Sequence, residues 1–118
     1  MRMKARYEDM VKNTINVELL DSIEKYIEKI SEYYKIDYVI LFGSYAKGTN
    51  HKDSDVDIAI VSKDIKDRFD DGANLMSLTW GINTSIEPHA FKTEEFKENE
   101  NPFIDEIIRT GIEIYSAS

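Results

Sequence analysis

Two runs of consecutive apolar, β-prone residues flank one polar segment, and this arrangement limits the possible folds more than any other part of the chain. The first run covers residues 38–42 and stops at Gly43-Ser44, and the second covers residues 56–61. Near-continuous apolar runs of this length are typical of strands buried inside a sheet. The glycine-containing polar residues 45–55 predict a loop. The chain is therefore expected to contain two buried strands joined by that loop.

Helical patterns and two further strand patterns account for the rest of the sequence. Apolar residues recur at three- and four-residue steps over 16–34, which predicts an amphipathic helix with Asn16 as its N-cap. Residues 64–80 also show helical spacing, with Gly72 as the weak point of one continuous helix. The other expected elements are a strand over 82–91, a helix over 103–110 after Asn101-Pro102, and a strand over 112–115. This order predicts an α/β (α+β) fold, in which helices pack on a small mixed sheet.

Three large apolar side chains share one stripe of the predicted 64–80 helix. Phe69, Met76 and Trp80 recur at helical spacing, and the simplest interpretation of such a stripe is packing in the core. A later acidic run is interpreted as a solvated face, and it consists of Glu94, Glu95, Glu98 and Glu100.

The charge balance restricts how this chain can handle a nucleic acid or a nucleotide. It has 15 Lys and Arg residues against 23 Asp and Glu residues, which gives a formal net charge of −8. Because basic residues dominate affinity for nucleic acids, direct DNA binding is not expected. An acidic protein that acts on a negatively charged substrate needs a divalent cation held by carboxylates.

The absence of cysteine and of long apolar segments excludes further kinds of site and location. With no cysteine, the chain has no disulfide, thiolate metal site or thiol nucleophile. The longest uncharged run, residues 72–86, is too short and too polar to span a bilayer, and no secretory signal is evident at the amino terminus. A cytoplasmic location is expected, and 118 residues leave room for one domain.

Two carboxylates at the start of the second predicted strand suit a shared cation. Because side chains alternate along a strand, Asp55 and Asp57 are expected on the same face, about 6–7 Å apart along the backbone. At about 5 Å and an effective dielectric constant near 20, two such charges repel by roughly 3 kcal/mol. A bound divalent cation reverses the sign of this interaction.

The Gly43-Ser44 pair at the end of the first predicted strand suits a phosphate. Glycine allows a sharp turn and a close approach of a phosphate to the backbone. Ser44 offers a hydroxyl and an N–H at an expected helix start, where anions bind favourably. Together with the paired carboxylates, this turn suits a triphosphate.

The two features occur at a spacing that resembles a known signature. Gly43-Ser44, ten intervening residues and Asp55-x-Asp57 match the G-S-x(10)-D-x-D pattern of the DNA polymerase β-like nucleotidyltransferase superfamily, and the chain looks like its minimal (MNT) branch. The resemblance implies a sheet whose three carboxylates hold two Mg²⁺ ions, and these ions hold the triphosphate of ATP, the nucleotide donor.

The similarity covers residues 38–62 and 86–115. It implies one minimal nucleotidyltransferase domain over 1–118, with a catalytic core at about 38–115. The helix over 16–34 precedes this core and is not diagnostic of the family.

The resemblance also implies roles for individual residues. Asp55 and Asp57 match the first two carboxylates, which are both metal ligands and catalytic. Glu87, the only acidic residue in the third predicted strand, is the candidate for the third, where relatives often have aspartate. It would bind the metal beside the attacking hydroxyl and ease its deprotonation. The implied nucleotide-binding residues are Gly43, Ser44 and Lys47, the last in place of the arginine of many relatives.

A chain of this size has no second domain to hold an acceptor, so the acceptor surface must come from a partner or from a second copy in a homodimer. Minimal members are commonly paired with a HEPN-domain protein. The resemblance therefore implies an antitoxin that transfers AMP to a tyrosine of a HEPN toxin. Two alternatives remain open at this point: a binding antitoxin that only occludes its partner, and a subunit that adenylylates a small molecule such as an antibiotic.

Other polar residues near the signature have both a functional and a structural interpretation. His89 shares a strand face with Glu87 and either approaches the nucleotide or forms an ordinary surface hydrogen bond. Tyr45 and Lys52 are candidates for contacts with base or phosphate, whereas His51 is expected to be solvated. A calcium loop starting at Asp53 is disfavoured, because its sixth and twelfth positions should be Gly and Glu and are Ile58 and Asp64.

Overall fold

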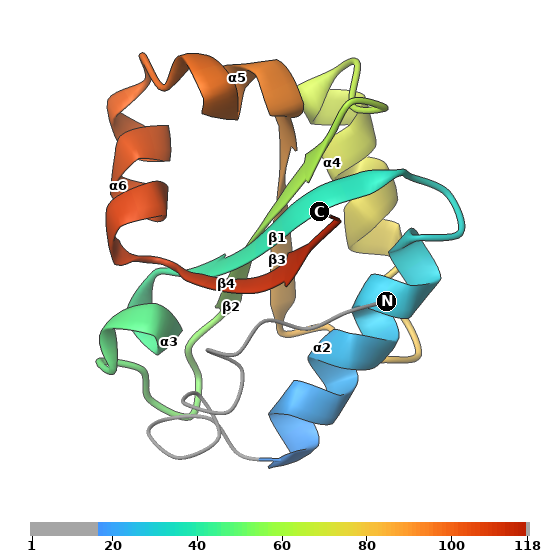
Figure 1. Ribbon diagram of the computed structural model, residues 1–118. Helices are drawn as coiled ribbons and strands as arrows, with labels where there is room; N and C mark the ends of the chain where they lie inside the picture. Colours follow the sequence, from blue (N-terminus) through green and yellow to red (C-terminus); the bar gives the residue numbers. More distant parts are fainter. Residues whose placement is uncertain (1–16, 118) are drawn as a thin grey trace.

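A four-stranded mixed sheet forms the centre of the computed structural model, which describes residues 17–117 (Figure 1). The strand order is β3-β2-β1-β4, so β3 and β4 are the edges. In chain order the elements are α2 (Val17–Ile30), β1 (Ile36–Phe42), α3 (Ser44–Lys47), β2 (Val56–Ser62), α4 (Arg68–Ser77), β3 (Ile86–Lys92), α5 (Thr93–Glu98), α6 (Pro102–Thr110) and β4 (Ile112–Ser116). The expected mixed α/β fold is confirmed.

Antiparallel and parallel pairings meet at β2. β1 pairs antiparallel with β2 and β4, whereas β2 and β3 run parallel. The connection between the two parallel strands contains α4, because a parallel pair requires a long crossover. In this register Asp57 lies opposite Phe42 on one side and opposite Glu87 on the other. The starts of β2 and β3 therefore lie at the same end of the sheet as the last residue of β1.

Helices cover both faces of the sheet, which explains why its strands are so apolar. α2 and α4 lie on one face, and α5 and α6 lie on the other (Figure 1). Strand residues in the core beside α2 include Val39, Leu41, Val56, Ile58, Ile60, Ile86 and Ala90. Those in the core beside α5 and α6 are Ile40, Phe42, Ala59, Val61 and Phe91. Within residues 17–117, no helix has the length and apolar character needed to cross a membrane.

The predicted helices at the two ends of the chain are confirmed with shifted bounds. The helix expected over 16–34 is α2, and its expected N-cap, Asn16, lies outside the described residues. The helix expected over 103–110 is α6, with proline at its first position. The Asn101 side chain accepts a hydrogen bond from the N–H of Phe103, at 2.9 Å, which satisfies one free donor of the first turn.

Two local details differ from the expectation, and a third is confirmed. β3 begins at Ile86 rather than at residue 82, because hydrogen-bonded turns occupy residues 79–85. The loop expected over 45–55 begins within the four-residue helix α3. The acidic run of residues 94–100 is solvated as expected, because Glu94, Glu98 and Glu100 are exposed, while the partly buried Glu95 of α5 accepts a hydrogen bond from the N–H of Lys92.

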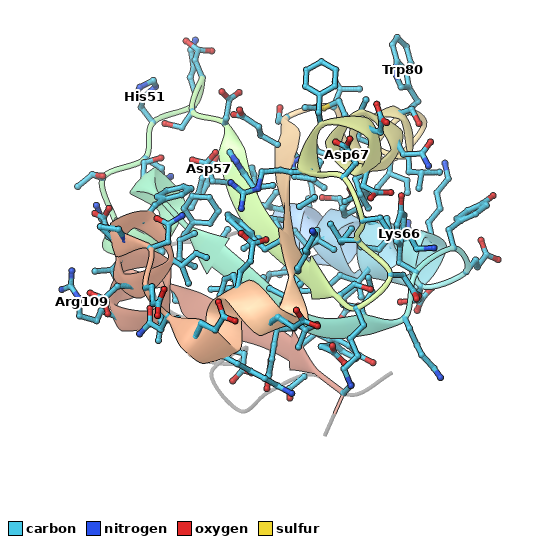
Figure 2. The ribbon with its side chains drawn as sticks, turned by 90° about the horizontal axis from the view of Figure 1, so that it is seen from above. His51, Asp57, Lys66, Asp67, Trp80 and Arg109 are labelled. Carbon is cyan, nitrogen blue, oxygen red and sulfur yellow. The ribbon has the colours of Figure 1, made fainter. Side chains whose placement is uncertain are left out.

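The interpretation of Phe69, Met76 and Trp80 as core residues is wrong. These side chains are 85%, 41% and 73% exposed. Figure 2 shows Trp80 projecting away from the body of the protein. The buried residue of α4 is Leu75, on a neighbouring stripe of the same helix.

Polar anchors explain this orientation of α4. The hydroxyl of the buried Tyr26 donates to the carbonyl oxygen of Leu75 at 2.8 Å, and the hydroxyl of Tyr34 donates to Asp71 at 2.9 Å. Both bonds hold the Leu75 side of the helix against α2 and its C-terminal turn. Hydrophobic periodicity does not reveal such hydrogen bonds, so the stripe with the larger side chains does not identify the buried face of α4.

Two glycines are expected to respond oppositely to the same substitution. A Cβ on Gly72, within α4, would meet no atom within 4 Å, so Gly72→Ala should stabilise the protein by about 0.5–1 kcal/mol. A Cβ on Gly111 would lie 2.6 Å from Cγ2 of Ile40 and even closer to the carbonyl oxygen of Ile107. Gly111→Ala should therefore destabilise it by about 1–3 kcal/mol. Urea unfolding measures both, and shifts of the same sign would contradict the close packing of α6 on β1.

Candidate active site

Three side chains with metal-binding atoms meet near the starts of β2 and β3. Asp57, Glu87 and His89 each offer one such atom, and these atoms all lie within 4.8 Å of one another. The register explains this, because Asp57 lies opposite Glu87, and His89 follows two residues later on the same face. All three residues are partly buried. In Figure 2, Asp57 lies well inside the outline of the molecule, whereas His51 and Trp80 project from its edge.

The glycine turn touches the same cluster. Gly43 adopts φ 73° and ψ −149° between β1 and α3, a conformation that L side chains rarely adopt. A Cβ on Gly43 would lie only 2.5 Å from Oδ2 of Asp57. Glycine is therefore required here for two reasons, the backbone angle and the close approach of the Asp57 carboxylate.

His89 is held in place by a carboxylate and two aromatic rings. Its Nε2 atom lies 3.2 Å from Oδ1 of Asp57. Its ring meets that of Phe42 edge to face, with centroids 5.0 Å apart, and that of Phe103 with centroids 6.5 Å apart. Phe42 and Phe103 also contact each other, at 5.7 Å. The contribution of Phe103 from α6 has no signal in the sequence, because it depends on how that helix packs.

The environment of Glu87 opposes a further negative charge. Burial raises the pKa of the Glu87 carboxyl, and the negative charge of Asp57 raises it further. A hydrogen bond with Asp55 acts in the same direction, whereas His89 lowers the pKa. Within residues 17–117, no lysine or arginine forms an ion pair with these three carboxylates. Among the described residues, His89 beside Asp57 is therefore the one side chain able to offset the negative charge of the cluster in an ion pair.

The remaining predicted residues lie around this cluster. Asp55 is exposed and stands just before β2, close enough to raise the pKa of Glu87 but outside the three-atom group. Ser44 is the first residue of α3 and is partly buried. Lys47, at the end of α3, forms an exposed ion pair with Glu106 of α6, at 3.2 Å. No sequence pattern indicated this pairing.

A separate cavity of about 610 Å³ lies on the opposite face of the sheet, beside α2. Tyr45, His51 and Lys52 line it, together with polar residues of α2 and of the segment before β3. Asp57 and Glu87 do not line it. The carboxylates thus lie on one side of the α3 end of the sheet, and Tyr45 and Lys52, the candidates for contacts with base or phosphate, lie on the other.

The donor set fits a divalent cation. Carboxylate oxygens are the ligands that Mg²⁺ prefers, and imidazole nitrogen suits several first-row transition metals. The carboxylates supply the charge, and the close spacing of Asp57, Glu87 and His89 supplies convergent donors. Asp57 and Glu87 thus stand where two ligands of a shared cation need to stand.

The raised pKa of Glu87 predicts a pH-dependent stability in the absence of metal. A carboxyl with a higher pKa in the folded state adds stability below its unfolded pKa and loses this contribution as the pH rises through the folded value. In EDTA, Glu87→Gln should therefore raise the thermal unfolding midpoint at pH 7 and leave little difference near pH 3.5. Glu98→Gln, at an exposed position of α5, is the control. A lower midpoint for Glu87→Gln at pH 7 would contradict the proposed repulsion.

Comparisons with solved structures show the same fold in other proteins. The chain is similar to a provisionally assigned nucleotidyltransferase of Sulfolobus solfataricus, with a TM-score of 0.63 and 20% identity over 98% of this chain and 91% of that one. It is also similar to a chain of a toxin–antitoxin complex with AMP-PNP, with a TM-score of 0.56 and 22% identity over 88% of this chain and 76% of that one.

Comparisons of sequence identify the family. The chain is 34% identical over 105 residues to a provisionally named protein adenylyltransferase, MJ0141, of Methanocaldococcus jannaschii, covering 83% of this chain and 100% of that protein. It is 48% identical over 35 residues to the protein adenylyltransferase MntA of Shewanella oneidensis, covering 30% of this chain and 25% of that protein. Residues 24–118 match the family model described as polymerase beta nucleotidyltransferase. The chain therefore belongs to the polymerase β nucleotidyltransferase family.

Proposed function

We propose that this protein is a Mg²⁺-dependent protein adenylyltransferase that transfers AMP from ATP to a tyrosine hydroxyl of a HEPN toxin and so acts as its antitoxin. The observation that carries this proposal is that the Gly43 turn lies against the carboxylate of Asp57, and Asp57 lies opposite Glu87 on the neighbouring strand. A phosphate-binding turn and a pair of metal-binding carboxylates then face one substrate. The similarity to MJ0141 and MntA, both named as protein adenylyltransferases, supports AMP as the group transferred.

We assign the cation ligands to Asp55, Asp57 and Glu87. When bound, two Mg²⁺ ions neutralise the triphosphate and stabilise the attacking and leaving oxygens. Asp57 and Glu87 come from neighbouring strands whose register is set by backbone hydrogen bonds, so their spacing does not depend on a flexible loop. The exposed Asp55 can approach from the start of β2.

The residues of the turn bind the phosphates. Gly43 lets the triphosphate approach the backbone, and the Ser44 hydroxyl donates to a phosphate oxygen. Lys47 adds positive charge once it leaves Glu106, and this exchange is easy because exposed ion pairs contribute only about 0.2–1 kcal/mol.

In the reaction, the acceptor oxygen attacks the α-phosphorus of ATP. The bond from this phosphorus to the bridging oxygen breaks, and pyrophosphate leaves with that oxygen. The proton of the acceptor hydroxyl passes to the Glu87 carboxylate and then to solvent.

The identity of the partner rests on the resemblance and on the solved complexes. Similar chains occur in toxin–antitoxin structures, including one described as MntA-HpeT, which supports a toxin as the acceptor. The exposed Phe69, Met76 and Trp80 offer apolar surface for a stable complex, and this surface also favours occlusion without catalysis as a second candidate function. A cytoplasmic location, where ATP is available, follows from the same proposal.

Isotope position tests the proposal directly. The protein is incubated with its partner toxin, Mg²⁺ and either [α-³²P]ATP or [γ-³²P]ATP. Label on the partner from the α position alone, on a tyrosine identified by peptide mass spectrometry, is expected for AMP transfer. Label from the γ position would indicate phosphorylation and contradict the proposal. Neutralisation of the toxin without any label would support occlusion instead.

A further inference from the structure

His89 stands at a distance from Asp57 that suits two ligands of one metal ion. Metal–ligand bonds to nitrogen and oxygen are about 2.0–2.2 Å long, so two ligands at right angles lie about 3 Å apart. The separation of Nε2 of His89 and Oδ1 of Asp57 is 3.2 Å. The third donor, from Glu87, lies within 4.8 Å of both. One ion can therefore contact all three side chains after only a small adjustment of the Glu87 side chain.

The ring of His89 is already oriented for this contact. Edge-to-face packing on Phe42 and proximity to Phe103 limit its rotation. On the adjacent strand it lies opposite Ala59, a small residue buried in the core beside α5 and α6. Nε2, the nitrogen near Asp57, is thereby directed toward the carboxylates. Such support by packing is what keeps a metal ligand in one position.

An imidazole ligand changes which cation the site prefers. Mg²⁺ prefers oxygen ligands, whereas imidazole nitrogen suits first-row transition metals; Mn²⁺, the weakest binder of that series, still accepts such a nitrogen more readily than Mg²⁺ does. We propose that His89 is a direct ligand of the cation held by Asp57 and Glu87, and that this site therefore selects Mn²⁺ over Mg²⁺. This inference rests on the proposed function only in that both assign a cation to Asp57 and Glu87.

The competing interpretation is that His89 only donates a hydrogen bond to Asp57 and positions its carboxylate. The two interpretations differ in one observable, a nitrogen atom bonded to the metal. Pulsed electron paramagnetic resonance of bound Mn²⁺ detects ¹⁴N coupling from a coordinated imidazole. The probe is Mn²⁺ alone, added to the full chain without nucleotide or partner.

We expect ¹⁴N coupling in the wild-type protein and its loss in His89→Gln, which keeps a hydrogen-bond donor for Asp57. His89→Gln should also weaken Mn²⁺ binding by about 10–100-fold, with a much smaller change for Mg²⁺ measured by competition. His89→Asn serves as a second variant, and circular dichroism checks that both fold. The matched control is His51→Gln, because His51 is the exposed histidine of the loop before β2 and should show no change.

Three outcomes would overturn this inference: bound Mn²⁺ without nitrogen coupling, coupling that persists in His89→Gln, or no Mn²⁺ binding at all. The test also separates this inference from the proposed function. Nitrogen coupling together with no α-label on the partner would leave the inference standing and remove the proposed function. Label transfer without nitrogen coupling would do the reverse.

Discussion

Asp57→Asn is expected to reduce AMP transfer to the partner on the order of a thousandfold, the scale of losing one charge-stabilising group in an active site. The substitution keeps the shape of the side chain and removes its charge. Asp57 contacts every other part of the site: its carboxylate lies against Gly43, it lies opposite Glu87 on the next strand, and it forms a hydrogen bond with His89. The measurement is the single-turnover rate of label transfer from [α-³²P]ATP.

Asp53→Asn is the control for this prediction. Asp53 is exposed in the loop before β2 and belongs to the same Asp-x-Asp-x-Asp run, but its side chain is outside the metal-binding group. Its transfer rate should stay within about twofold of wild type, as exposed substitutions change little. Asp57→Asn should still bind the partner toxin in a pull-down. If it kept more than a tenth of the wild-type rate, Asp57 would have no central role in the reaction.

The spacing of the signature named candidate residues for the site, but it did not show how they meet. Alternation along a strand would place Asp55 and Asp57 on one face, but β2 begins at Val56, so Asp55 lies just before the strand. The position of Glu87 beside Asp57 depends on the register of β2 and β3, two parallel strands joined through α4. Such a register is decided by packing between distant segments. Glu87 could therefore be named from the sequence only because it was the one acidic residue in the strand.

The errors in predicting the fold have the same origin. For α2, the apolar stripe and the buried face coincide, because Leu20, Ile23 and Ile27 have no competing stripe. For α4, the larger stripe faces solvent, because the hydroxyl of Tyr26 reaches the backbone of Leu75 from the other side. Together with the bond from Tyr34 to Asp71 and the burial of Leu75, this contact between distant segments fixes an orientation of α4 that the local pattern does not predict. Hydrophobic periodicity therefore predicted the existence of both helices, but it predicted the buried face correctly only for α2.

Gly43→Ala is expected to lower the transfer rate by about a hundredfold and to destabilise the fold by about 1–2 kcal/mol. The loss of stability follows from φ 73° and ψ −149°, a combination that a residue with a Cβ adopts only at a cost of this order. The loss of rate has a separate cause. The new Cβ would lie 2.5 Å from Oδ2 of Asp57, so the carboxylate must move, and a displacement of about 1 Å in an active site can cost a hundredfold.

Gly81→Ala separates these two effects, because Gly81 also has a positive φ, 82°, while a Cβ there would meet no atom within 4 Å. Both variants should lower the free energy of unfolding, measured with urea, because both introduce a Cβ at a positive φ. Only Gly43→Ala should lose transfer activity, and it should also bind Mn²⁺ more weakly, because the displaced Asp57 can no longer share the cation with Glu87. Equal rates in the two variants would mean that the turn and the carboxylate act independently. The Gly-Ser and Asp-x-Asp parts of the signature would then be two neighbouring features rather than one site.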